Sequence, residues 1–252
     1  RLPSFTRATA HPWLFNNKDY INNETCIRRY AAEMTTIDDG VGEILAKLTA
    51  LGIDRDTLIV FTSDNGGAGG QGGIWGMGDH TRPLSAFEHT MQVPLIWWHP
   101  GRIAAGRTPG IMVSHRDFLP SMLDHLAIAD ALPSARTLTG RSYAAALGQS
   151  GEVRDWDNTL FYEYETLRCV RTETWKWIER QGSEVDELYD LSSDPGETRN
   201  LAGAPGQASQ QAGLKRKLDA FFNQHATPGF DLWRGGRSKA KLIHESGTKP
   251  AR

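Results

Sequence analysis

The chain has 252 residues, with 28 Lys and Arg against 30 Asp and Glu, and its formal net charge is -2 at pH 7. This near balance disfavours a protein that binds nucleic acid or an anionic membrane, because such proteins carry a basic surplus. With 39% hydrophobic and 23% charged residues, the composition predicts a globular chain with a sizeable core. No stretch approaches the ~18 consecutive apolar residues of a membrane span.

The chain ends and the cysteines give no localisation. The first residues, Arg1-Leu2-Pro3-Ser4, contain neither an initiator Met nor the charged-then-apolar pattern of a signal peptide, so we expect a processed chain or a piece of a longer one. The two cysteines, Cys26 and Cys169, are too few for a disulfide scaffold and lack the spacing of a zinc site.

The first elements along the chain are a helix and a strand. Residues 24–49 repeat apolar side chains at steps of three and four, which predicts one face of an amphipathic helix. Residues 57–62 are a short run of β-formers, typical of a strand covered on both faces, and favour a parallel α/β sheet. Residues 93–98 predict a second strand and Met112-Val113 a third, and a helix is expected to start near Pro120.

A second domain is predicted after a stretch rich in Pro, Ser and Gly. Four short runs separated by turn residues predict an antiparallel meander, and a helix near the end of the chain is expected to cover one of its faces. The runs are residues 161–164, 169–171, 175–178 and 187–191, and the helix spans residues 207–225. The predicted boundaries are a first domain at residues 1–130, a linker at 131–153, an α+β subdomain at 154–227 and a polar tail at 228–252.

Polar residues directly follow the first predicted strand, in the order Ser63-Asp64-Asn65-Gly66. Ligands of open α/β sheets bind outside the carboxyl ends of strands, so a site is expected here. A carboxylate followed by an amide oxygen suits a hard divalent cation such as Ca²⁺. The same residues are a turn signal by composition alone, and an ordinary turn is the alternative interpretation.

A glycine-rich stretch, residues 66–78, comes next and contains a G-x-G-x-x-G match at Gly67, Gly69 and Gly72. A dinucleotide-binding fingerprint must open a helix, and no helical periodicity follows here. The stretch therefore predicts a flexible loop that borders an active site, with Trp75 as its one anchor.

Three further residues are candidates for the same site. His80 would supply a proton donor and Arg82 an anion contact, with two surface groups as the alternative. His115 follows another predicted strand and would reach the same crevice, although an ordinary loop histidine is the favoured interpretation.

Several motifs, taken in order, carry a family resemblance. They are residues 30–45, residues 51–66, Phe87-Glu88, Val93-Pro94-Leu95-Ile96 with Pro100-Gly101, residues 113–120, Glu187-Leu188-Tyr189-Asp190-Leu191, Asp194-Pro195-Gly196-Glu197 and Asn200-Leu201. This order resembles the sulfatase family of the alkaline-phosphatase-like superfamily. The resemblance covers residues 24–203, and spaced motifs in order are more specific than any one alone.

The resemblance implies a fold and a metal site. The implied fold is α/β and alkaline-phosphatase-like, with a partial parallel or mixed sheet, flanking helices and a small C-terminal antiparallel sheet covered by a helix. Residues 1–130 would be the C-terminal part of the catalytic domain. The family's Asp-Asn metal pair carries over onto Asp64 and Asn65, with Ca²⁺ as the expected ion and Mg²⁺ or Mn²⁺ as alternatives. Many relatives have a Lys at the position of Pro83, so Arg82 or His80 would contact the sulfate instead.

Other family features have no counterpart in the chain. The formylglycine nucleophile arises from Cys or Ser in a C/S-x-P/A-x-R segment, and Cys26 lies in Cys26-Ile27-Arg28-Arg29-Tyr30, which does not match. A metal-binding aspartate pair and an upstream Lys and His are also not found. The chain therefore resembles the C-terminal half of a sulfatase, and we expect an N-terminal half to complete the site and this chain alone to be inactive.

Three functions follow from these observations. The first is a metal-dependent sulfuric ester hydrolase that acts on a sulfated small molecule or carbohydrate. The second is a phosphodiesterase or phosphonate monoester hydrolase, because the same anion site suits phosphoryl oxygens. The third is a non-catalytic fragment or interaction module.

Overall fold

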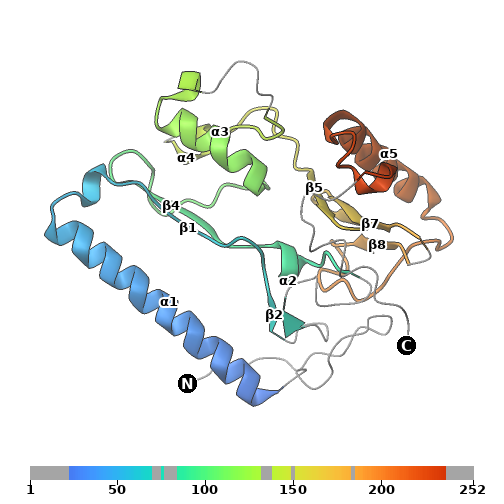
Figure 1. Cartoon of the computed structure of the whole chain (residues 1–252), viewed down its shortest axis with the longest axis horizontal. Helices are drawn as coiled ribbons and strands as arrows, with labels where there is room; N and C mark the ends of the chain where they lie inside the picture. Colours follow the sequence, from blue (N-terminus) through green and yellow to red (C-terminus); the bar gives the residue numbers. More distant parts are fainter. Residues whose placement is uncertain are drawn as a thin grey trace. The chain divides into compact units, whose positions relative to one another are not determined.

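The computed structural model describes residues 23–69, 75–76, 84–131, 138–148, 151–182 and 185–236 (Figure 1). The chain divides into two compact units. The first unit comprises Arg1–Arg82 and Phe87–Asp157, and the second comprises Pro83–Ala86 and Asn158–Arg252. The domain boundaries expected from the sequence stay a prediction.

The first described element of the first unit is the long helix α1, Glu24–Ala50, which confirms the predicted amphipathic helix. The helix ends before Gly52, whose φ of 67° lies in the left-handed region that glycine adopts without strain. A short 3₁₀ helix, η2 (Asp54–Asp56), then leads into strand β1, Ile59–Thr62.

The sheet of the first unit is the main departure from the prediction. Strand β1 pairs antiparallel with β4, Leu95–Trp98, with Phe61 opposite Ile96, whereas the sequence favoured a parallel sheet. A parallel pair needs a crossover connection of a dozen or more residues, usually helical. The described residues between the two strands contain only the four-residue helix α2, Glu88–Met91, and the two-residue strands β2 (Ala68–Gly69) and β3 (Trp75–Gly76).

Two smaller predictions for the first unit are wrong. Met112-Val113 forms no strand, and helix α3 spans His115–His125 instead of starting near Pro120. The cap explains the earlier start, because Ser114 and Asp117 form a reciprocal capping box. The unit also contains η5 (Ala129–Ala131) and α4 (Ala144–Leu147).

The second unit is an antiparallel meander covered by a helix, as predicted. Its strands are β5 (Leu160–Tyr164), β6 (Leu167–Arg171), β7 (Trp175–Arg180) and β8 (Glu187–Asp190), and they lie in this order in one sheet. Helix α5, Ala208–His225, packs on β6 and β7, and η6 (Leu232–Arg234) follows it.

The core of the second unit lies between α5 and one face of its sheet. Val170 lies opposite Trp177, and Trp177 lies opposite Leu188, in the cross-strand register, so these three residues share the face beneath the helix. The helix contributes Leu214, Leu218 and Phe222, all buried. This pattern is the apolar stripe expected of a helix that covers a sheet.

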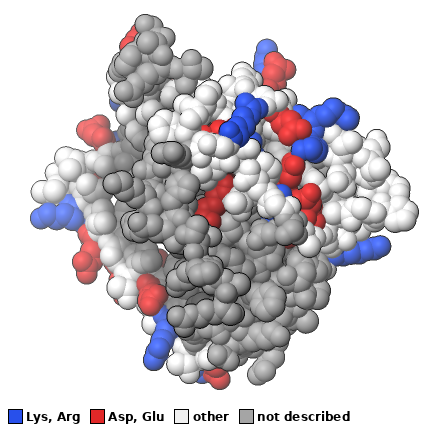
Figure 2. Space-filling view, turned by 45° about the vertical axis from the view of Figure 1, so that its right-hand side comes forward, with Lys and Arg blue, Asp and Glu red and all other residues white. Residues whose placement is uncertain are grey.

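The fold class is therefore the one expected: a mixed α/β protein with flanking helices and a small antiparallel sheet under a helix. Among the described helices, none combines the length and the apolar character that crossing a membrane would require. On the face drawn in Figure 2, positive and negative side chains of the described residues are interspersed.

Candidate functional site

The Ser63-Asp64-Asn65-Gly66 turn lies directly after the last residue of β1, Thr62. The Ser63 hydroxyl donates to the Asn65 carbonyl at 2.8 Å, and the Asn65 backbone N–H donates to Asp64 Oδ1 at 2.9 Å. These short-range bonds fold the turn on itself, as Ser and Asp commonly do. Asp64 remains exposed at the surface of the first unit.

The Asn65 side chain is oriented by its own turn. Its Nδ2 donates to the Gly66 carbonyl at 2.8 Å, so the amide nitrogen is engaged and the amide oxygen is the atom left to serve as a ligand. A carboxylate oxygen and an amide oxygen on consecutive residues are the hard donors that Ca²⁺ takes. The donor set therefore fits such a cation, and the described stretches contain no cluster of three or more His, Cys, Asp or Glu that could hold a metal ion.

Gly66 attaches the turn to helix α2. Its N–H donates to the Thr90 carbonyl at 3.0 Å, and a Cβ at this position would lie 2.5 Å from the His89 carbonyl oxygen. Any side chain here would force the two segments apart, so the close approach requires glycine. The turn is consequently held both by its hydrogen bond to α2 and by its covalent connection to β1.

His115 contacts the same turn from α3. Its Nε2 lies 2.7 Å from the Ser63 carbonyl oxygen, and because a carbonyl only accepts, Nε2 is the donor. His115 is the first residue of α3, fixed in place by the capping box in which Asp117 accepts from the Ser114 N–H at 2.8 Å. The sequence favoured an ordinary loop histidine here, and the structure instead places it at a helix start against the strand end.

The start of α3 is itself held by contacts with the segment around Gly140. Asp117 is buried, and its second carboxylate oxygen accepts from the Arg141 N–H at 2.9 Å. Gly140 packs so tightly that a Cβ there would lie 1.9 Å from the Arg116 carbonyl oxygen. The segment around Gly140 lies in the part of the chain that the sequence predicted as a linker, and composition gave no signal for this support.

Two of the predicted site residues cannot be placed. His80 and Arg82 lie outside the described residues, so their roles stay a prediction. The same holds for most of the glycine-rich stretch, of which the structure describes residues 66–69 and 75–76. The structure therefore brings together Asp64, Asn65 and His115.

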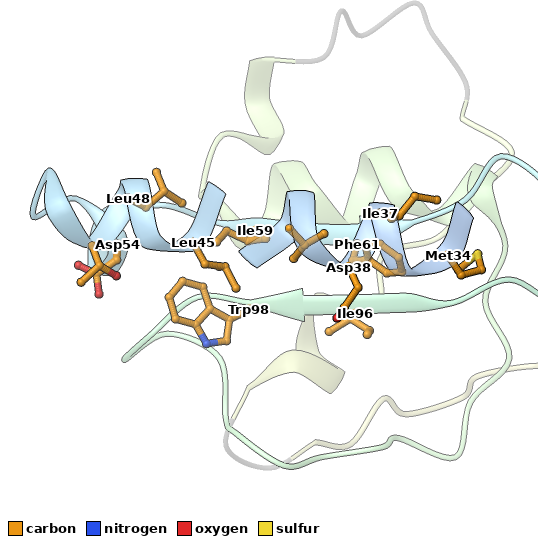
Figure 3. A pocket seen from close by; sticks show the side chains of 12 residues that line it. Met34, Ile37, Asp38, Leu45, Leu48, Asp54, Ile59, Phe61, Ile96 and Trp98 are labelled. Carbon is orange, nitrogen blue, oxygen red and sulfur yellow. The ribbon is translucent and has the colours of Figure 1, made fainter. Parts of the chain in front are cut away.

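A cavity of the first unit lies elsewhere, between α1 and the β1–β4 pair (Figure 3). It is a groove of about 580 Å³ lined mainly by apolar side chains: Met34, Ile37, Asp38, Val41, Leu45, Leu48, Thr49, Asp54, Ile59, Phe61, Ile96 and Trp98. Its charged residues, Asp38 and Asp54, are both acidic and would repel a sulfate or phosphate group. The groove is therefore an uncovered core surface and a poor candidate for the anion site.

The fold and the strand-end turn define a class: an α/β protein with oxygen-bearing side chains in a turn outside the carboxyl end of a strand, where ligands of open α/β sheets bind. Sequence comparison gives the family. The sulfatase family matches residues 8–128, and the family described as N-sulphoglucosamine sulphohydrolase, C-terminal, matches residues 82–224. The chain belongs to the sulfatase family.

Individual relatives agree with this assignment. A sulfatase from Formosa agariphila is 30% identical and aligns with 79% of this chain and 40% of its own length. The N-acetylglucosamine-6-O-sulfatase of Bacteroides thetaiotaomicron is 28% identical, with 79% and 36% covered. The chain thus spans about two fifths of the length of the curated relatives it matches.

Solved structures share the fold. The structure of BT4656 in complex with its substrate D-glucosamine-2-N,6-O-disulfate matches with a TM-score of 0.68 at 28% identity, over 79% of this chain and 40% of that one. The phosphonate monoester hydrolase of Agrobacterium radiobacter matches with a TM-score of 0.69, also at 28% identity, over 79% and 42%. The first of these structures contains a disulfated sugar as its substrate, and the second is named as a hydrolase of phosphonate monoesters.

Proposed function

We propose that this chain forms part of a sulfuric ester hydrolase that acts on sulfated sugars, and that Asp64 and Asn65 supply oxygen ligands to its divalent cation. The observation that carries the proposal is the strand-end turn, in which an exposed carboxylate and an oriented amide oxygen lie on consecutive residues. The relatives named for sulfated amino sugars support the substrate class.

The residues of the turn have distinct parts in this proposal. Asp64 supplies negative charge and Asn65 a neutral oxygen, which suits Ca²⁺ first and Mg²⁺ or Mn²⁺ as alternatives. When bound, such an ion stabilises the charge that develops on the oxygens of the transferred group. His115 and Gly66 hold the turn so that the two oxygens keep one geometry, and preorganisation of this kind makes an electrostatic site effective.

The remaining roles belong to residues that the structure does not describe or the chain does not contain. We propose Arg82 as a charge-assisted contact to the anionic group and His80 as a proton donor. The nucleophile is proposed to be a formylglycine supplied by the part of the protein that corresponds to the rest of the relatives' length. The 252-residue chain by itself is expected to show no turnover.

Hydrolysis of phosphonate monoesters is the second candidate. It is favoured by the match to a phosphonate monoester hydrolase, which is as close in fold and identity as the match to the structure with the disulfated sugar. A cation, an arginine and a histidine suit phosphoryl oxygens as well as sulfuryl oxygens.

The test is kinetic and uses the complete protein that contains this chain. Asp64→Ala is expected to abolish turnover and to lower the metal content measured after dialysis, while the circular dichroism spectrum is retained because Asp64 is exposed. Asp56→Ala is the matched control: it removes an exposed aspartate just before the other end of β1. Wild-type activity and metal content in Asp64→Ala would contradict the proposal, and paired sulfate and phosphonate esters decide between the two substrates.

A further inference from the structure

The face of the small sheet opposite α5 carries several buried charged side chains. Lys176 and Glu187 have no exposed surface and Arg180 is 5% exposed, although charged side chains are rarely buried to this extent. Burying a charge is unfavourable unless a counter-charge and hydrogen bonds compensate, so the partners of these cations show what the cluster does.

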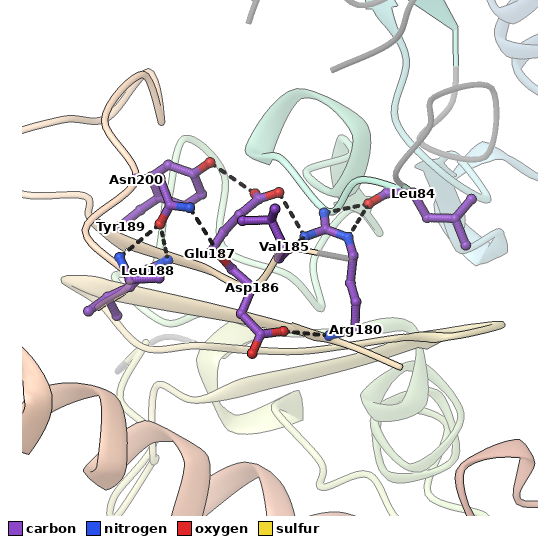
Figure 4. A network of polar contacts seen from close by, with 9 residues as sticks. Leu84, Arg180, Val185, Asp186, Glu187, Leu188, Tyr189 and Asn200 are labelled. Atoms are coloured by element: carbon purple, nitrogen blue, oxygen red, sulfur yellow. Dashed lines mark hydrogen bonds and ion pairs between the residues drawn. The ribbon is translucent and has the colours of Figure 1, made fainter. Parts of the chain in front are cut away.

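Each cation has one carboxylate and at least one main-chain carbonyl as partners. Lys176 Nζ lies 2.6 Å from Glu197 Oε1 and donates to the Ala86 carbonyl at 2.9 Å. Arg180 Nη1 lies 2.8 Å from Glu187 Oε1, and its Nε and Nη2 donate to the Leu84 carbonyl at 2.9 and 2.5 Å (Figure 4).

One of the two carboxylates, Glu187, is itself held by a hydrogen bond. Tyr189 donates its hydroxyl to Glu187 Oε2 at 2.9 Å, and Glu197 is fully buried next to Lys176. Burial and the adjacent Glu187 carboxylate raise the pKa of Tyr189, which keeps this hydroxyl protonated as a donor. The cluster therefore presents two cationic side chains as donors to the backbone of Leu84–Ala86, which we call the clamped segment.

The clamped segment runs directly into the support of the Asp64-Asn65 turn. Ala86 is followed by Phe87 and α2, and the Phe87 carbonyl accepts from both the N–H and the hydroxyl of Thr90, each at 2.9 Å. The carbonyl of Thr90 then accepts from the Gly66 N–H. A short path of covalent and hydrogen bonds thus leads from Lys176 and Arg180 to the turn.

We propose that Lys176 and Arg180 are positioning residues for the Asp64-Asn65 turn: by binding the carbonyls of Leu84 and Ala86 they fix the chain that enters α2. The expected effect on turnover rests on the proposed function, whereas the expected effect on the mobility of the turn does not. Cationic side chains are not needed here for stability alone, because apolar residues of similar volume often stabilise a core to the same extent as a buried ion pair does. Binding two carbonyl oxygens requires donors.

The first experiment measures the clamp without any activity. Amide hydrogen exchange of Gly66 and Thr90 is followed in the chain itself for Arg180→Gln and Lys176→Met. Both variants are expected to speed exchange of the Gly66 amide by about tenfold or more, because each removes a charge-assisted bond to the clamped segment. Arg180→Lys, which keeps a cation, is expected to restore part of the protection and serves if Arg180→Gln does not fold.

Arg168→Gln is the matched control. Arg168 is another buried arginine of the same sheet, ion-paired to Asp231 at 2.7 Å and to Glu163 at 2.6 Å, with neither partner in the clamped segment. Arg168→Gln is expected to lower the stability of the second unit while the exchange rate of the Gly66 amide stays as in the wild type. The exchange rates are compared under conditions in which every variant is folded. Equal Gly66 exchange in all variants would overturn the proposal.

The second experiment uses the complete protein. Arg180→Gln and Lys176→Met are expected to lower kcat about tenfold and to weaken metal retention, with KM changed less, whereas Arg168→Gln lowers the melting temperature alone. If kcat falls equally in Arg168→Gln, the positioning role is overturned and a structural one replaces it. If Asp64→Ala is active while Gly66 exchange still responds to Arg180→Gln, the proposed function fails and the clamp stands.

Discussion

The two units differ in how completely each buries its own apolar residues. In the second unit Trp177 is 1% exposed and lies in a cluster closed by α5. In the first unit Ile96 is 58% and Trp98 41% exposed, and both line the groove beneath α1. The second unit therefore encloses its own hydrophobic core, whereas the first unit leaves apolar side chains exposed along the groove.

The difference has a physical consequence for the whole protein. Apolar surface left in water is unfavourable by about 25 cal/mol per Å², and exposed apolar patches of this kind mark interaction surfaces. The chain spans about two fifths of its relatives' length, and we expect the remainder to cover the groove. Substitutions of matched residues in the two units test this difference in burial.

The largest expected effect is at the two tryptophans. Trp177→Ala should destabilise the second unit by about 3–5 kcal/mol, since it leaves a cavity in a packed core. Trp98→Ala should change the stability of the first unit far less in the chain alone, because little packing is lost. Native-state hydrogen exchange of β6–β8 and of β1–β4 reports on each unit separately. Equal losses at both sites would show that the first unit is also closed.

The next effect compares two ion pairs. Arg168→Ala should destabilise the second unit by about 3 kcal/mol, because it leaves the buried Asp231 with only the longer ion pair to Arg234, at 3.4 Å, and removes the guanidinium from the Phe222 ring, 4.0 Å away. Arg28→Ala breaks the exposed pair with Glu24 on α1 and should change stability by under about 0.5 kcal/mol. Chemical denaturation measures both, and a large effect of Arg28→Ala would contradict the contrast.

Adjacent glycines give a smaller and more local effect. Gly66→Ala places a Cβ against the His89 carbonyl and should cost about 1–3 kcal/mol, with loss of the Gly66–Thr90 hydrogen bond. Gly67→Ala meets no atom within 4 Å among the described residues and should stay within about 0.5 kcal/mol. Thermal unfolding compares the two, and a harmless Gly66→Ala would mean that α2 does not hold the turn.

The smallest effect is a pH dependence in the first unit. Burial, followed by the charges of His99 and Arg102, lowers the pKa of His125 from its usual 6.5. A lowered pKa in the folded state means that His125 contributes stability above pH 6.5, and this contribution is lost as pH falls through the folded pKa. His125→Gln should therefore flatten the acid side of the stability curve. An unchanged slope between pH 7 and 5 would refute this.

The sequence by itself determined the local elements with strong periodicity. Helices α1 and α5 and the four-strand meander were predicted because repeats of about 3.6 and 2 residues, with turn residues between them, are encoded locally. The Asp64-Asn65 turn was found for the same reason, since strand and turn signals are adjacent in the chain. Spaced motifs also gave the family.

Tertiary structure alone decided what joins residues far apart in the chain. The antiparallel pairing of β1 and β4, the contact from His115 to Ser63 and the binding of Leu84 and Ala86 by Arg180 and Lys176 all depend on which segments meet in space. Composition does not distinguish a buried lysine from a solvated one, or a covered strand from one facing a groove. Those differences arise from packing, because the partner that compensates a buried charge or covers an apolar face can lie anywhere in the sequence.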